Sequence, residues 1–121
     1  MLSADHRLST AAEFRQVVRR GRRAGGPLLV VHLMTVNVDK ATSGFDGEVP
    51  RRVGFVVSKA VGNAVTRNRV KRRLRHLMRE RLDQLALGTL VVVRATPAAG
   101  AASYRDLGSE LDRCLGRVVG S

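Results

Sequence analysis

Cysteine, aromatic residues and acids are all scarce in this sequence. The chain of 121 residues holds one cysteine, one tyrosine, three phenylalanines and no tryptophan. Because Cys114 has no second cysteine to pair with, an internal disulfide is excluded, and a reducing cytoplasm is the expected compartment. No apolar run approaches the length of a membrane span, and the N-terminal segment lacks the apolar core of a signal peptide. We therefore expect a cytoplasmic protein with no membrane association.

The shortage of acids leaves a large positive charge. The chain has 10 Asp and Glu residues against 22 Lys and Arg residues, a net charge of +12. Such a charge needs counterions, which predicts a polyanionic partner. Of the basic residues, 19 are Arg and only 3 are Lys. Since a guanidinium grips phosphate at two points and stacks on bases, this bias favours RNA or DNA as the partner.

The patterns of a protein-based catalyst are also missing. The sequence has no HExxH motif, no pair of cysteines and no glycine-rich phosphate loop. Its histidines and aspartates are scattered, whereas a metal-dependent nuclease needs clustered carboxylates. Cys114 falls in an apolar helical stripe, where a buried and inert thiol is expected. We assign no catalytic residue and no metal site, and we expect the protein alone to be chemically inert.

Periodicity and turn residues predict one domain covering residues 1–121. A first helix should begin near Thr10, where Glu13 completes a capping box, and end at Gly21. A strand over 28–38 is apolar on both faces and should be covered on both sides. The other expected strands are 22–25, 53–59 and 89–95, with a hairpin-type loop over 39–52.

The C-terminal part should form a loop and a last helix. Residues 97–102 read PAAGAA and are expected to be the loop, after which Ser103 caps the helix with Asp106 near its third position. The expected buried stripe of this helix is Tyr104, Leu107, Leu111, Cys114, Leu115 and Val118. With the basic helix described next, the order αβββαβα predicts an α+β sandwich of helices packed against one small sheet.

The segment 63–81, NAVTRNRVKRRLRHLMRER, concentrates the charge of the chain. Eight cations and one acid lie within the fifteen residues 67–81, which amounts to +7 of the net charge of +12. On a helical wheel, one arc is apolar and should dock on the sheet: Val70, Leu74, Leu77, Met78 and Leu85. The opposite face is cationic, with Arg72, Arg75 and Arg79 at its centre and Asn68, Arg69 and Arg73 beside them.

Three interpretations of this cationic face compete. A solvated face usually alternates charges of both signs, and a lipid-binding helix carries Trp or Phe on its apolar side. Neither feature is present, which favours contact with phosphate groups. Asn68 lies between two arginines, and its amide can hydrogen-bond a ribose or phosphate of folded RNA. The alternative for both Asn63 and Asn68 is a capping role at the helix start.

The residues around this helix resemble a known family. The stretch VGFVVSKAVGNAVTRNRVKRRLR combines a strand ending in Ser-Lys, a Gly-Asn turn and an Arg-Asn-Arg helix, and it resembles the signature of the bacterial ribonuclease P protein subunit. The opening RLSTAAEFRQVVRRGRRAGGPLLVVHL resembles the family's first helix and following strand. GTLVVVRATPAAGAASYRDLGSELDRCL resembles its last strand, loop and helix, so the likeness covers almost the whole chain.

The resemblance implies a subunit that binds a large catalytic RNA and helps it remove 5′ leaders from precursor tRNA. The RNA would carry the Mg²⁺-dependent endonuclease chemistry, and no stable protein partner is implied. The implied fold is a two-layer α/β sandwich of about four strands with a left-handed βαβ crossover, like the second domain of ribosomal protein S5. The matching positions that would contact the catalytic RNA are Arg67, Asn68, Arg69, Lys71, Arg72 and Arg75.

The family also has a cleft between its first helix and the sheet, through which the single-stranded leader passes. The matching positions are Phe14, Val18, Val30, His32 and Lys59. Val18 and His32 stand where some relatives carry Phe or Tyr, so we expect the leader contact to depend on Phe14, His32 and nearby arginines. The alternatives are an ordinary core residue for Phe14 and a satisfied strand histidine for His32.

Two other functions share the charge of this chain. A ribosome-associated protein or RNA chaperone would have the same charge and a similar sandwich, and the RNA that co-purifies would distinguish it. A helix that reads the DNA major groove needs base-reading side chains on a projecting helix, and competition by duplex DNA would test it. The ribonuclease P subunit is favoured because the strand, turn and basic helix occur in order with both flanks matching.

Overall fold

The computed structural model describes residues 11–35 and 51–119 of the chain. Its helices and strands are α1 (Ala11–Arg20), β1 (Arg22–Gly25), β2 (Leu29–Thr35), β3 (Arg52–Val56), α3 (Ala64–Arg79), β4 (Thr89–Ala95) and α4 (Tyr104–Val119). Short 3₁₀ helices lie between them at η2 (Lys59–Val61), η3 (Leu82–Gln84) and η4 (Pro97–Ala101). None of the described helices is long and apolar enough to cross a membrane. The predicted order αβββαβα and the α+β class are confirmed.

The strands form one mixed sheet with the spatial order β1-β2-β4-β3. β2 pairs antiparallel with both β1 and β4, whereas β3 pairs parallel with β4. A parallel pair needs a crossover, and α3 supplies it in a β3–α3–β4 unit. The prediction of a hairpin-type loop over 39–52 is wrong, because β4 lies between β2 and β3 and the two strands are not neighbours in the sheet. Residues 36–50 themselves lie outside the described part of the chain.

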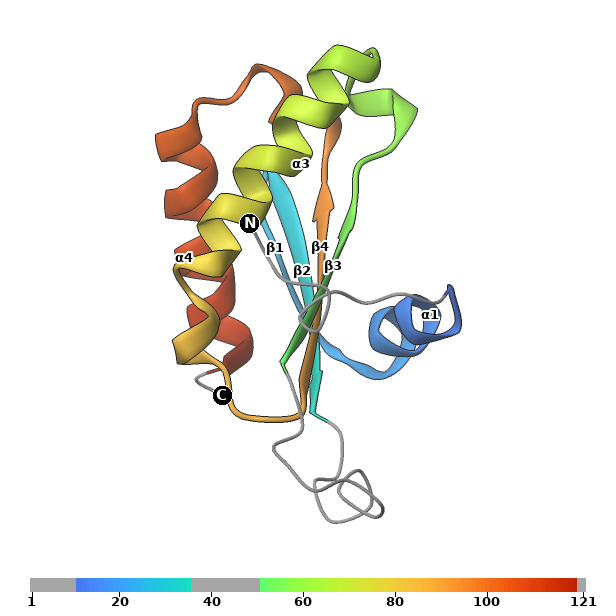
Figure 1. Ribbon diagram of the computed structural model, residues 1–121, viewed down its shortest axis with the longest axis vertical. Helices are drawn as coiled ribbons and strands as arrows, with labels where there is room; N and C mark the ends of the chain where they lie inside the picture. Colours follow the sequence, from blue (N-terminus) through green and yellow to red (C-terminus); the bar gives the residue numbers. More distant parts are fainter. Residues whose placement is uncertain (1–10, 36–50, 120–121) are drawn as a thin grey trace.

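Helices cover both faces of the sheet (Figure 1). α3 and α4 pack on one face, where Leu29, Leu74 and Leu111 belong to the main core. α1 packs on the other face, where Val17 and Val92 belong to a second, smaller core. β2 is therefore covered on both sides, as predicted. The sheet with α3 and α4 forms the two-layer sandwich implied by the family resemblance, and the main core lies between these two layers. α1 covers part of the other face of the sheet.

Local signals place the start of α3 and of α4. Asn63 Oδ1 accepts a hydrogen bond from the Thr66 backbone N–H at 2.9 Å, which confirms its capping role. Gly62 has a φ of 155°, a conformation that favours glycine, and a Cβ at this position would lie 2.9 Å from the Thr66 side chain. Ser103 Oγ accepts a hydrogen bond from the Asp106 N–H at 3.0 Å and caps α4, as predicted.

The end of α1 is also predictable from local sequence. The helix ends at Arg20, immediately before Gly21, as predicted. A Cβ at Gly21 would lie 2.5 Å from the Val17 carbonyl oxygen, so only glycine fits this close approach. Thr10, the predicted cap of α1, lies outside the described residues.

Several predicted boundaries differ from the structure. β3 ends at Val56, and Lys59 lies in η2 rather than in the strand. Residues 97–101 form η4 instead of an open loop, with Pro97 preorganising its first turn. Leu85 is buried as predicted, but it follows η3 because α3 already ends at Arg79. Tyr104 is 41% exposed at the start of α4, so it is not part of the buried stripe.

A buried glutamate joins α4 to the turn between β1 and β2. Glu110 is 7% exposed, and its Oε2 accepts hydrogen bonds from the backbone N–H groups of Leu28 and Leu29 at 2.6 and 2.5 Å. Its Oε1 accepts from Arg113 at 3.0 Å. A Cβ at Gly26 would collide with the Glu110 carboxylate, which accounts for glycine at that position. Charge-assisted bonds of this kind hold the β1–β2 hairpin against α4.

Candidate nucleic-acid interface

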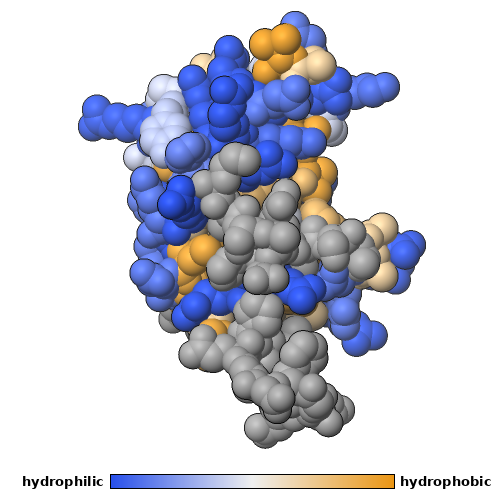
Figure 2. All heavy atoms as spheres, in the orientation of Figure 1, coloured by the Kyte–Doolittle hydropathy of each residue, from blue (hydrophilic) through white to orange (hydrophobic). Residues whose placement is uncertain are grey.

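α3 turns its charged side chains to solvent on the face opposite the sheet. Val70, Leu74, Leu77 and Met78 are buried, as predicted. The side chains on the opposite face form what we call the α3 ridge: Asn68, Lys71, Arg72, Arg75 and Arg79. Figure 2 shows hydrophilic side chains gathered over the upper part of the molecule, where α3 lies. The amphipathic pattern thus fixes which face of α3 is available to a polyanion.

A hollow on the α3 ridge brings four of the predicted contact residues together. Asn68, Lys71, Arg72 and Arg75 line it, and its volume is about 350 Å³. Within the described residues, none of these three cations lies within 4.0 Å of a carboxylate. An anion in this hollow would therefore meet three cationic groups and one amide without competition from an acid.

Three other arginines of this segment are tied to the protein itself. Arg69 donates to the Gly100 carbonyl oxygen at 3.0 Å, and Arg73 donates to that of Ala102 at 3.0 Å. Arg81 donates to Asp112 at 2.6 and 3.1 Å. This hydrogen bond lowers the pKa of the Asp112 carboxyl and raises the pKa of Arg81. Arg81 is therefore neutralised locally and does not belong to the α3 ridge.

Arg75, which belongs to the α3 ridge, and Arg67, which lies beside it, are both half-buried. The Nε of each is buried and has no hydrogen-bond partner among the described residues. Each guanidinium has four further N–H donors, which remain for solvent or a ligand. The predicted set is thus divided by the fold: Asn68, Lys71, Arg72 and Arg75 share a hollow, whereas Arg69 reaches toward η4.

Four of the five predicted leader contacts, all except Lys59, come from the opposite face of the sheet. Phe14 is partly buried on α1 and packs against the core formed by Val17, Leu90 and Val92. Val18, on the same helix, is 36% exposed. Val30 of β2 is half-buried. This arrangement brings Phe14, Val18 and Val30 to one side of the sheet but leaves Phe14 engaged in packing.

Sequence reasoning missed three residues of this face, which are Arg23, Val56 and Arg94. Val30 lies opposite Arg94 in the β2–β4 register, and Val56 lies beside Arg94 in the β3–β4 register. Arg23 of β1 lies opposite His32. We call the set Val18, Val30, Val56, Arg23 and Arg94 the α1-side face. Arg94 is the one charged residue of a mostly apolar strand, TLVVVRA, and this lone charge is the signal that could have identified it.

His32 is buried beneath this face. Its side chain is 3% exposed, and neither ring nitrogen has a hydrogen-bond partner among the described residues. Burial, together with the positive charges of Arg94 and Arg23, lowers its pKa, so the neutral ring is favoured. Its ring offers little surface for stacking in this conformation, and contact with a leader stays a prediction.

Lys59 lies apart from the other predicted leader contacts. It is exposed in η2, which follows β3 and precedes α3. In Figure 1, η2 lies at the end of the sheet away from α1. Lys59 therefore stands beside the start of α3 rather than beside Phe14.

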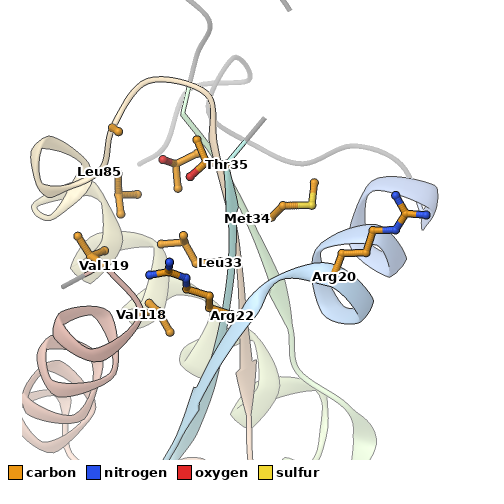
Figure 3. A pocket seen from close by; sticks show the side chains of 10 residues that line it. Arg20, Arg22, Leu33, Met34, Thr35, Leu85, Val118 and Val119 are labelled. Atoms are coloured by element: carbon orange, nitrogen blue, oxygen red, sulfur yellow. The ribbon is translucent and has the colours of Figure 1, made fainter. Parts of the chain in front are cut away.

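A further hollow at one end of the sheet takes no part in the predicted site. It has a volume of about 370 Å³, and its lining includes Leu33, Leu85, Val118 and Val119, with Arg20 and Arg22 among the remaining residues. Figure 3 shows Leu33, Leu85, Val118 and Val119 on one side of β2 and Met34 on the other. Apolar side chains predominate in it, and the predicted contacts lie elsewhere.

Cys114 is buried in α4, and burial together with the negative charge of Glu110 raises the pKa of its thiol. A thiol of raised pKa is a poor nucleophile at neutral pH, as expected. Within residues 11–35 and 51–119, no three His, Cys, Asp or Glu side chains come together as metal ligands.

Comparison with known proteins identifies the family. The family model for ribonuclease P matches residues 2–119. A ribonuclease P protein component from Streptomyces avermitilis is 55% identical over 120 residues, which cover 99% of this chain and 97% of that protein. One from a Nocardioides species is 56% identical over 118 residues, which cover 98% and 95%.

Solved structures share the fold. The Staphylococcus aureus RNase P protein has a TM-score of 0.76 at 24% identity, covering 93% of this chain and 94% of that chain. The Thermotoga maritima RNase P protein has a TM-score of 0.73 at 20% identity, covering 93% and 97%. With the family model matching nearly all of its residues, the chain belongs to the ribonuclease P protein family.

Proposed function

We propose that this subunit of ribonuclease P uses its two faces for two different RNAs. The α3 ridge binds phosphates of the catalytic RNA. The α1-side face and Phe14 bind the single-stranded 5′ leader of precursor tRNA. The two surfaces lie on opposite sides of one thin sheet, so the protein stands between the catalytic RNA and the leader of its substrate.

The observation that supports this proposal most directly is the hollow on the α3 ridge. Three cations and one amide line a space of about 350 Å³ with no carboxylate partner among the described residues. Holding like charges together costs electrostatic free energy unless counterions balance them. Closely spaced phosphates of a folded RNA supply that balance, and the Asn68 amide adds a hydrogen-bonding group for ribose or phosphate.

In this proposal the chemistry belongs to the RNA. Mg²⁺ is required by the assembled enzyme and supplies charge stabilisation to phosphodiester cleavage when bound. The described residues offer no cluster that could hold it, so we derive no step through a protein-bound metal. The contribution of the chain is to neutralise phosphates near the catalytic RNA, which lowers the RNA's demand for Mg²⁺, and to hold the leader. A cytoplasmic location, argued from the single cysteine, is part of the same proposal.

The test is cleavage of the 5′ leader of a precursor tRNA by a bacterial ribonuclease P RNA at low Mg²⁺. The reaction is run with the RNA alone, with the protein alone and with both. We expect cleavage only when both are present, and less of it with the Arg72→Ala/Arg75→Ala protein. Absence of rescue by a protein that still binds RNA would instead support a ribosome-associated or RNA-chaperone role, which the family match does not favour.

A further inference from the structure

α1 carries a second cationic surface, on the side turned away from the sheet. Arg15, Gln16, Arg19 and Arg20 are all exposed, whereas Val17 is fully buried against the sheet. Together with Ala12, the four exposed residues line a hollow of about 370 Å³. We call Arg15, Gln16, Arg19 and Arg20 the α1 outer face. Neither the α3 ridge nor the α1-side face includes them.

The α1 outer face repeats the composition of the hollow on the α3 ridge. Each hollow is lined by three cations and one amide, Gln16 on α1 and Asn68 on α3. Each set lies within about two turns of one helix, at the i, i+3 and i+4 spacing that brings side chains together on a helical surface. The volumes are also alike, about 370 and 350 Å³. Similar geometry and charge indicate a similar ligand, the phosphate groups of a nucleic acid.

No acid balances this charge within the described part of the chain. The carboxylate of α1, Glu13, lies 3.5 Å from Arg52 of β3. The other ion pairs found there involve Arg81 and Arg113, far from α1 in sequence. Three uncompensated arginines on ten helical residues repel one another, and phosphates relieve that repulsion.

The position of α1 selects which RNA this surface meets. Val18 belongs to the α1-side face, Arg15 is its neighbour on the helix surface at i−3, and Arg19 is in turn the neighbour of Arg15 at i+4. A strand lying across Val18 therefore reaches these arginines next. The α3 ridge lies on the other side of the sheet, so an RNA docked there does not share this surface.

We propose that the α1 outer face binds backbone phosphates of the 5′ leader, beyond the nucleotides held on the α1-side face. This inference rests on the proposed function, because it extends the leader site around α1. Contact with phosphates carries no base specificity, so the surface increases affinity for long leaders of any sequence.

The test compares two leader lengths in the assembled enzyme. Precursor tRNAs with a short and a long leader are bound to holoenzyme reconstituted with the parent protein or with Arg15→Gln/Arg19→Gln. We expect the parent to bind the long leader more tightly and the variant to lose that gain. The salt dependence of long-leader binding should become shallower by about 1.4 in log Kd against log salt, since each contact to a single strand contributes about 0.7.

Two further variants serve as controls. Arg105→Gln/Arg117→Gln removes the same charge from exposed positions of α4 and should keep the gain from the long leader. Arg15→Lys/Arg19→Lys keeps the charge on α1 and should retain most of the gain in affinity from the long leader. Failure of the lysine variant to restore binding would also count against a phosphate contact.

The other outcomes separate this inference from the proposed function. If Arg15→Gln/Arg19→Gln weakens binding of both leaders equally, or of the catalytic RNA alone, the α1 outer face contacts the catalytic RNA and the inference is wrong. If long-leader binding is unchanged in the variant, the face is simply solvated and only this inference fails. If the affinity of the parent holoenzyme for precursor tRNA does not depend on the leader at all, both this inference and the proposed leader site are wrong.

Discussion

His32 is a buried titratable side chain that feels the positive charges of Arg94 and Arg23. Its lowered pKa means that the folded protein keeps the ring neutral at a pH where the unfolded chain, with a pKa near 6.5, already binds a proton. The unfolded state therefore gains protons first as the pH falls, and the folded state loses stability progressively below about pH 6.5. Above that pH, both states hold a neutral ring and the effect vanishes.

We predict that His32→Leu reduces this acid sensitivity. The free energy of unfolding, measured by urea denaturation at several values between pH 7.5 and 5, should fall less steeply in the variant than in the parent. His76→Gln, at an exposed histidine of α3, serves as the control. Equal slopes in His32→Leu and the parent would mean that the ring takes up its proton without cost in the folded state.

Phe14 is both a packing residue and the one aromatic side chain on its helix. Its ring packs against Val17, Leu90 and Val92 yet stays partly exposed. If a leader base stacks on it, Phe14→Ala removes about 1–3 kcal/mol of binding, a loss of roughly 5- to 150-fold in the preference for precursor over mature tRNA. Affinity for the catalytic RNA alone should be unchanged, because α3 lies on the other face of the sheet.

The Phe14 prediction is checked by filter binding of both tRNAs to the assembled enzyme, with thermal melting of the free protein. Phe14→Leu is the matched control, since it keeps apolar volume in the α1 core but has no ring to stack. A lower melting temperature with the precursor preference intact would identify Phe14 as a core residue only.

At the scale of the element, α3 contains two kinds of arginine. Arg72 and Arg75 line the ridge hollow, whereas Arg69 and Arg73 donate to carbonyl groups of Gly100 and Ala102. The sequence pattern places all four on or beside one cationic face and does not distinguish them. Their difference depends on where η4 lies, which no local signal around α3 encodes.

We predict that two double variants with equal charge loss will separate these roles. Arg69→Ala/Arg73→Ala should lower the free energy of unfolding by about 0.5–1.5 kcal/mol for each hydrogen bond lost. Arg72→Ala/Arg75→Ala should leave unfolding nearly unchanged and weaken catalytic-RNA binding more. Urea denaturation and RNA titration of both proteins provide the comparison. Equal stability of the two variants would argue against a structural role for the bonds to η4.

For the molecule as a whole, charge predicts a steep salt dependence. If about six cations contact phosphates, affinity for the catalytic RNA should fall by about 10³ or more between 50 and 200 mM salt. Titrations at several salt concentrations, with Arg72→Ala/Arg75→Ala beside the parent, measure the slope and the share that the α3 ridge contributes. An affinity that does not change with salt concentration would show that the α3 ridge is not the RNA-binding surface.

Local features of the whole fold were predictable because short segments encode them. The apolar arc of α3, the Asn63 and Ser103 caps and the glycine that ends α1 each depend on residues a few positions apart. The pairing of β3 was not predictable in this way. Its neighbour β4 begins 33 residues after the end of β3, from 56 to 89, and no short pattern specifies such a partner.

The sequence by itself determined the charge, the order of elements and the face of α3 that turns to solvent, and its motifs identified the family. Only the tertiary structure decided that α1 and α3 lie on opposite faces of the sheet and that Arg23, Val56 and Arg94 meet on one of them. The physical reason is distance along the chain. Helical periodicity acts between residues that are close in the sequence. Strand order and the partners of buried polar groups depend on residues that are far apart in it. Glu110, for example, accepts a hydrogen bond from the Leu28 N–H, 82 positions away.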